Sequence, residues 1–118
     1  MTPIHRTVTA LLYSGRPDPR WEINVAQLEH LKVIWNALTE SHHPPHSPPA
    51  LGYRGCAVRG APKQVWFVYD GMVTFRGSTG VAGFRVDAAR QFEKAVLASA
   101  PKAVGPSILK VAKALNLD

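Results

Sequence analysis

The chain has a single cysteine and no long apolar run. Cys56 is alone among 118 residues, so an internal disulfide is excluded, and a lone thiol is typical of a reducing compartment. No stretch approaches the roughly 18 to 20 uninterrupted apolar residues of a membrane span. Residues 1–6 also lack the basic start and the apolar run of a secretory signal. We therefore expect a cytoplasmic protein that does not enter a membrane.

Acidic side chains are scarce as well. The sequence holds 8 Asp and Glu residues against 14 Lys and Arg residues, which gives a formal net charge of +6. Such an excess favours acidic partners, namely nucleic acid, phosphorylated ligands or an acidic protein surface. The cations are spread from Arg6 to Lys113, however, without the cluster of about five that marks a nucleic-acid tail. A solvated basic surface is therefore the simpler interpretation.

The composition favours one packed domain over residues 1–118, because 46% of the residues are apolar and 19% are charged. The patterns predict a strand at 5–13, a helix at 24–40, a His/Pro-rich connector at 41–50, strands at 53–59, 64–69 and 72–76, a loop at 77–86, and helices at 87–100 and 106–115. We expect an α+β fold in β-α-β-β-β-α-α order. Its small, four-stranded, mainly antiparallel sheet would carry helices packed on one face.

Three local signals support these elements. Asn24, with Gln27 three residues later, matches a capping box at a helix start. The dipeptide Asp70-Gly71 lies between two apolar runs and is preferred in tight type I′ hairpins. Asp87 is expected to cap the helix that follows it.

The segment SGRPDPRW, with the tyrosine before it, is the first candidate binding loop. It lies between a predicted strand and a predicted helix, a place where loops often carry function. Its arginines suit a carboxylate or a phosphate, its aromatic rings suit stacking, and its prolines hold the loop stiff. A purely architectural role is the alternative, with the aspartate accepting from the backbone or an arginine and the tryptophan closing the core. The candidate residues are Tyr13, Arg16, Asp18, Arg20 and Trp21.

The segment GYRG contributes Tyr53 and Arg54 to the same candidate surface. Its glycines indicate a bulge or a close approach of two backbones. Cys56 follows two residues later, and a nearby cation could make it a nucleophile, although nothing in the sequence places a histidine beside it. A small buried core cysteine is the favoured interpretation.

Three histidines, His42, His43 and His46, lie among prolines and could bind a divalent transition metal. The prolines prevent the helical spacing of known zinc motifs, so adventitious surface binding is favoured, and no cofactor is expected. Residues 77–83 are a weaker candidate for an anion nest beside Arg76, because Asp87 would repel an anion there.

These observations rank three functions. The first is a binding or accessory module that grips an acidic ligand or a partner protein through the SGRPDPRW and GYRG loops. The second is sequence-tolerant nucleic-acid binding by a basic sheet face carrying some of Trp66, Phe67, Tyr69 and Phe75. Alternation puts Trp66 on one face of its strand and Phe67 and Tyr69 on the other, without saying which face is exposed.

The third is an enzyme with a site that the sequence does not assemble, since no paired carboxylates or triad are evident. A homo-oligomer or a complex with another chain is compatible with all three functions.

Overall fold

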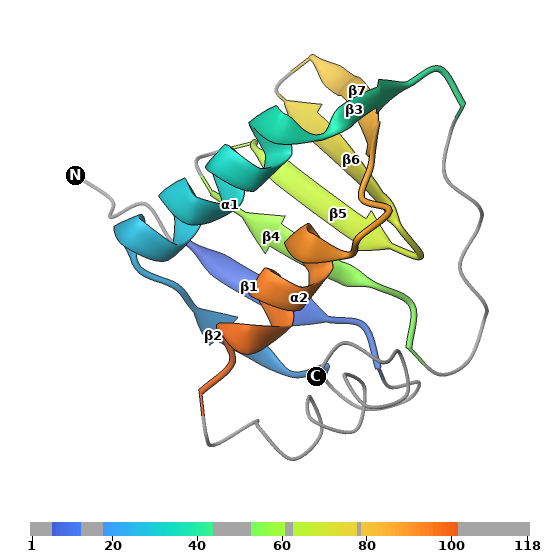
Figure 1. The fold of residues 1–118 in the computed structure, drawn as a ribbon. Coiled ribbons are helices and arrows are strands. Elements are labelled where there is room, and N and C mark those ends of the chain that lie inside the picture. Colours follow the sequence, from blue (N-terminus) through green and yellow to red (C-terminus); the bar gives the residue numbers. More distant parts are fainter. Residues whose placement is uncertain (1–5, 13–17, 44–52, 61–62, 78, 102–118) are drawn as a thin grey trace.

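The computed structural model describes residues 6–12, 18–43, 53–60, 63–77 and 79–101. These residues form seven strands and two helices, and all strand pairs are antiparallel within one sheet of order β2-β1-β4-β5-β6-β7-β3 (Figure 1). The elements are β1 (Thr7–Ala10), β2 (Arg20–Glu22), α1 (Val25–Ala37), β3 (Thr39–Ser41), β4 (Cys56–Arg59), β5 (Val65–Tyr69), β6 (Met72–Gly77), β7 (Gly80–Val86) and α2 (Gln91–Ala98).

The predicted four-stranded sheet is therefore wrong, because the sheet has seven strands. The two edge strands, β2 and β3, have three residues each, too few to show any alternation in the sequence. The residues predicted as a loop at 77–86 contain β7 instead. Its glycines, Gly80 and Gly83, pair with Gly77 and Phe75 of β6, and β3 pairs with the last three residues of β7, so strand pairing holds the segment extended despite its glycines.

The signals for α1 and for the central hairpin are confirmed. The Asn24 side chain accepts from Gln27 N, and the Gln27 side chain accepts from Asn24 N, both at 2.8 Å. Asp70 and Gly71 join β5 to β6 with φ values of 50° and 79°, as a type I′ turn requires. The helix predicted to continue to residue 40 ends earlier, because Leu38 turns extended and the chain enters β3.

The prediction that Asp87 begins the second helix is wrong by three residues. Arg90 is the residue before α2 and has a left-handed backbone, with φ of 56°. Asp87 nevertheless serves the helix start, because its carboxylate accepts from the backbone N–H of Phe92 and of Glu93 at 3.1 and 3.2 Å. The predicted helix at 106–115 and most of the connector at 41–50 lie outside the described residues.

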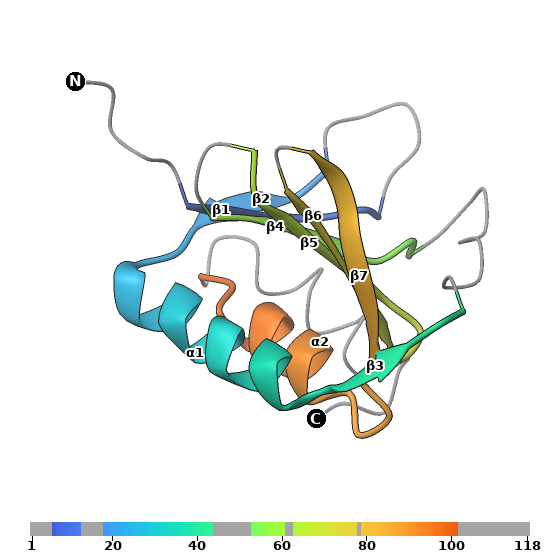
Figure 2. The ribbon, with the colours of Figure 1, turned by 90° about the horizontal axis from the view of Figure 1, so that it is seen from above.

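Both helices lie on the same side of the sheet (Figure 2). One apolar core fills the space between them and the strands; its fully buried members include Val8, Val58, Val68, Val73, Phe92 and Val96. Within the part of the chain that the structure describes, no helix covers the opposite side of the sheet (Figure 2). The fold thus has one face covered by α1 and α2 and one face, here called the open face, that these two helices leave uncovered.

Candidate functional site

Burial along β5 shows which side chains belong to the open face. Trp66 and Val68 are buried toward the helices, whereas Val65, Phe67 and Tyr69 alternate with them and are half-buried. Because successive side chains of a strand point to opposite faces, the second set lies on the open face. Of the four aromatic residues proposed for base stacking, Phe67 and Tyr69 are therefore on this face, while Trp66 and Phe75 pack in or against the core.

Strand pairing brings cations together on the open face. Arg59 of β4 is opposite Val65 of β5, and Val65 is opposite Arg76 of β6. Directly opposite residues share a face and neighbouring strands lie about 4.8 Å apart, so the two arginines flank Val65 in one row. The next row on the same face places Phe67 between Ala57 and Thr74. The aromatic residue Phe67 therefore lies one cross-strand row away from the row that contains Arg59 and Arg76.

These residues line a hollow of about 530 Å³. Its walls are Arg59, Lys63, Val65, Phe67, Thr74, Arg76 and Gly77. All three cations are exposed, and none of them forms an ion pair with another described residue. A hollow with an aromatic floor and three unneutralised cations has a positive potential and suits a ligand that combines negative charge with planar rings. We take it as the candidate functional site.

Gly55 positions the aromatic ring of this site. Its φ of +102° is a conformation that side-chain-bearing residues rarely adopt, and a Cβ atom there would lie 2.9 Å from Phe67 Cζ and 2.5 Å from Val68 O. The Phe67 ring thus lies against the backbone of Gly55. The close backbone approach expected from the GYRG segment is confirmed at this residue.

The SGRPDPRW segment is largely committed to internal contacts. Asp18 accepts a hydrogen bond from Leu12 N at 2.8 Å and lies 3.9 Å from the Arg54 guanidinium. Trp21 is 5% exposed, and its indole N–H donates to Ser99 Oγ at 2.9 Å. These contacts match the architectural role for Asp18 and Trp21. Tyr13 and Arg16 lie outside the described residues.

Arg20 is the one residue of that segment that the structure places on the open face. It is exposed, pairs with Thr9, and Thr9 pairs with Ala57, so Arg20 belongs to the same cross-strand row as Phe67. It lies three strands from Phe67, at about 14 Å by the usual strand spacing. Glu22, two residues along β2, is exposed on the same face and pairs with Thr7 in the row of Arg59, so β2 adds one charge of each sign and the excess of cations is confined to the hollow.

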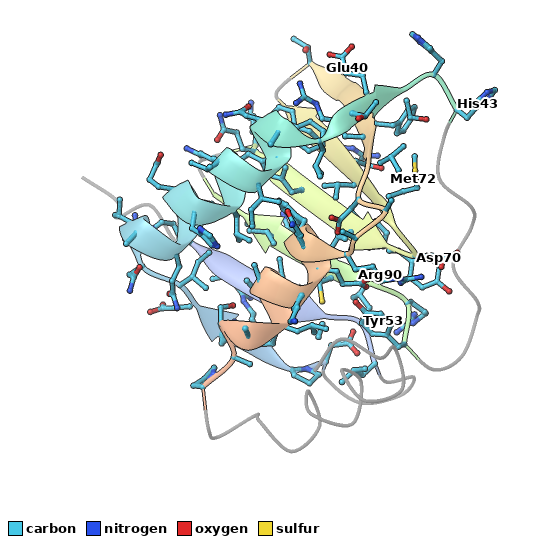
Figure 3. The ribbon with its side chains drawn as sticks, viewed as in Figure 1. Glu40, His43, Tyr53, Asp70, Met72 and Arg90 are labelled. Carbon is cyan, nitrogen blue, oxygen red and sulfur yellow. The ribbon has the colours of Figure 1, made fainter. Side chains whose placement is uncertain are left out.

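Tyr53 belongs to a separate, buried cluster. Its hydroxyl donates to Glu93 Oε2 at 2.5 Å and lies 3.5 Å from Cys56 Sγ. Glu93 is fully buried, and Arg90 Nη1 donates to its other oxygen at 3.3 Å while Arg90 Nη2 pairs with Asp70 at 3.1 Å. Tyr53, Arg90 and Asp70 lie close together at one corner of the molecule (Figure 3). The cluster ties α2 to the start of β4 and to the hairpin turn.

Burial dominates the titration of this cluster. It raises the pKa of Glu93, even though the Tyr53 hydroxyl and the Arg90 guanidinium both act to lower it. Burial also raises the pKa of Tyr53, and it raises the pKa of the Cys56 thiol to about 12. A thiol held neutral at physiological pH is a poor nucleophile. The interpretation of Cys56 as a buried core residue is confirmed.

The histidine cluster is described only in part. His42 and His43 are exposed just after β3, where Figure 3 labels His43, and His46 lies outside the described residues. Among the described side chains, no group of three or more His, Cys, Asp or Glu residues is placed to hold a metal ion. The metal hypothesis for His42, His43 and His46 therefore stays a prediction.

A second hollow, of about 360 Å³, lies between α1, β3 and β7. Its cation, Arg85, is already engaged: it stacks on the Trp35 ring at 4.6 Å, donates to Trp35 O at 2.9 Å and lies 3.6 Å from Glu40. Because this guanidinium is neutralised by its neighbours, the second hollow offers less to an anion than the hollow of the open face.

Sequence reasoning missed Arg59 and Lys63 as site residues, and it considered Arg76 only as the neighbour of a weak anion nest at 77–83. Each looks like an ordinary surface cation, and they gather only through the register of three strands. The one available signal was the short connection between the predicted strands at 53–59 and 64–69. A turn there places Arg59, at the end of the first strand, opposite Val65, near the start of the second. Lys63 itself has a left-handed backbone, with φ of 67°.

No helix in the described part of the chain is both long and apolar enough to cross a membrane. Comparison with known proteins identifies no matching family model, no similar curated protein and no similar solved structure.

Proposed function

We propose that the protein binds nucleic acid on the open face of its sheet. The observation that carries the proposal is the grouping of Arg59, Lys63 and Arg76 around Phe67, with no described acidic side chain lining the same hollow. Lysine and arginine contacts to phosphates supply most of the affinity in sequence-tolerant nucleic-acid binding, and aromatic rings add stacking to bases. The net charge of +6 favours the same class of ligand.

The loop-based binding module has less support. Trp21 is buried and Asp18 is held by a backbone amide and Arg54, so these groups are not poised to grip a ligand. That hypothesis now depends on Arg20, which is exposed, and on Tyr13 and Arg16. The enzyme hypothesis loses its proposed nucleophile, because Cys56 is fully buried and the burial raises its thiol pKa to about 12.

The test is binding of a fluorescein-labelled mixed-sequence oligonucleotide, followed by fluorescence anisotropy at several salt concentrations. The double variant Arg59→Gln/Arg76→Gln removes two charges from the open face. The control Lys32→Gln/Lys94→Gln removes two charges from the helices. We expect the first variant to weaken binding and to reduce the slope of log affinity against log salt by about 1.4 to 1.8, since each phosphate contact contributes about 0.7 to 0.9.

The control should leave both the affinity and the slope close to those of the wild type. Equal losses in the two variants would mean that only overall charge matters and that the open face is not the site. Absence of any salt-dependent binding by the wild type would contradict the proposal as a whole.

A further inference from the structure

We infer that the nucleic acid bound on the open face is single-stranded, with one base stacked on Phe67 and the phosphates on either side of that base held by Arg59 and Arg76. This inference rests on the proposed function and deepens it. It follows from the arrangement of the two cross-strand rows rather than from the charge alone.

The aromatic ring discriminates between single and double strands. In a duplex the faces of the bases are covered by their neighbours in the stack, and only base edges and phosphates are accessible. A side chain that offers a ring face within the sheet surface can therefore gain a stacking contact only from a base that is already unpaired and unstacked. Phe67 is half-buried on β5 and lines the hollow, which places its ring within the sheet surface for such a contact.

The shape of the open face also disfavours a duplex. Among the described residues, no helix projects from this face to enter a major groove (Figure 2). The hollow of about 530 Å³ is within the range of roughly 300–1,000 Å³ that is usual for sites holding one small molecule. It can therefore take a single base with its sugar.

The spacing of the cations sets the direction in which the nucleic-acid strand crosses the sheet. Arg59 and Arg76 are one strand spacing from Val65 on either side, so their Cα atoms are about 10 Å apart across the sheet. Phe67 lies two residues from Val65 along β5, about 7 Å away. A backbone that crosses β4, β5 and β6 at right angles would meet both guanidinium groups and present a base to Phe67. Lys63, which also lines the hollow, adds a third charge beside this path.

One edge of the Phe67 ring is packed before any ligand arrives. Phe67 rests against Gly55, where a side chain would collide with it. A ring that is already packed loses less conformational entropy when a base stacks on it, so the contact with Gly55 favours binding.

The experiment compares three probes of equal length by fluorescence anisotropy: a labelled single-stranded 12-mer of deoxythymidine, a labelled 12-base-pair duplex, and a labelled 12-mer in which every nucleotide is abasic. The wild type should bind the thymidine strand more tightly than the other two. The variant Phe67→Leu should weaken binding of the thymidine strand by about 5- to 150-fold, the range for loss of one stacked base. It should leave the abasic strand almost unchanged, because that probe has phosphates and no bases.

The variant Phe67→Trp keeps a stacking surface and should bind the thymidine strand at least as well as the wild type, which covers the case in which Phe67→Leu does not fold. If the duplex and the abasic strand bind as tightly as the thymidine strand, and Phe67→Leu changes none of them, the inference is wrong. If Arg59→Gln/Arg76→Gln nevertheless binds all three probes more weakly than the wild type does, nucleic-acid binding on the open face is still supported and only the single-strand inference fails. If that double variant changes none of them, both proposals fail.

Discussion

Replacing Glu93 by glutamine tests whether the buried cluster limits stability at neutral pH. Glu93 is fully buried, and its burial raises its pKa despite the hydrogen bond from Tyr53 and the charge of Arg90. The native state therefore holds the carboxyl proton more tightly than the unfolded chain does, whose glutamate pKa is about 4.3. Glutamine keeps an oxygen that accepts from Tyr53 but cannot ionise.

The sign and the size of the expected change in unfolding free energy follow from the linkage between proton binding and folding. The stability that the protonated carboxyl contributes is fully present below the unfolded pKa, and it is lost as the pH rises through the higher native pKa. Each unit by which the pKa is raised corresponds to about 1.4 kcal/mol of unfolding free energy. Between pH 4 and pH 8, the unfolding free energy of Glu93→Gln should therefore rise relative to that of the wild type. The rise should be about 1.4 kcal/mol for each unit by which the native pKa of Glu93 is raised.

Urea denaturation measures this change directly. Trp21 and Trp66 are both 5% exposed, so their fluorescence reports unfolding of the core. The unfolding free energies of the wild type and of Glu93→Gln are compared at pH 4, 6 and 8. The control is Glu29→Gln on the exposed side of α1, where the pair with Lys32 contributes less than about 0.5 kcal/mol.

A free-energy difference between the wild type and Glu93→Gln that stays constant with pH would refute the reasoning. A difference that grows in favour of the wild type as the pH rises would show that Arg90 and Tyr53 outweigh burial, and it would reverse the sign of the pKa shift.

Three further outcomes are expected. Asn24→Ala should lower the unfolding free energy by about 1 kcal/mol and Asn24→Gly by only a few tenths, as measured by chemical denaturation, because glycine is tolerated at a helix N-cap and alanine is not; equal losses would contradict the capping role. Gly55→Ala should destabilise by about 2 kcal/mol or more, because its φ is +102° and a Cβ would meet Val68 O; a melting temperature equal to that of the wild type would show that the backbone is not constrained there. Cys56 in the folded protein should react with iodoacetamide at pH 8 far more slowly than in urea, as followed by mass spectrometry, and similar rates would mean that the thiol is accessible.

Elements with a complete local signal were predictable from the sequence. The capping box at Asn24 and the turn at Asp70-Gly71 each depend on a few neighbouring residues, and both were placed correctly. The strands β4, β5 and β6 carry enough apolar and β-branched residues to be recognised one by one.

The strands β2, β3 and β7 were not predictable in this way. Each exists because a neighbouring strand offers it hydrogen-bonding partners: β1 for β2, β7 for β3, and β6 for β7. Three residues at an edge, or a segment rich in glycine, have too little intrinsic preference for the extended state to be identified without those partners.

The sequence by itself determined the sign of the charge, the α+β character, and the separation of Trp66 from Phe67 onto opposite faces of one strand. Only the tertiary structure decided which of those faces is open, because that depends on where α1 and α2 pack. The tertiary structure also decided that Arg59 and Arg76 flank one row of the sheet, since residues far apart in the chain become neighbours only through strand register. Local sequence fixes the alternation of side chains, whereas the long-range pairing of strands assembles the site.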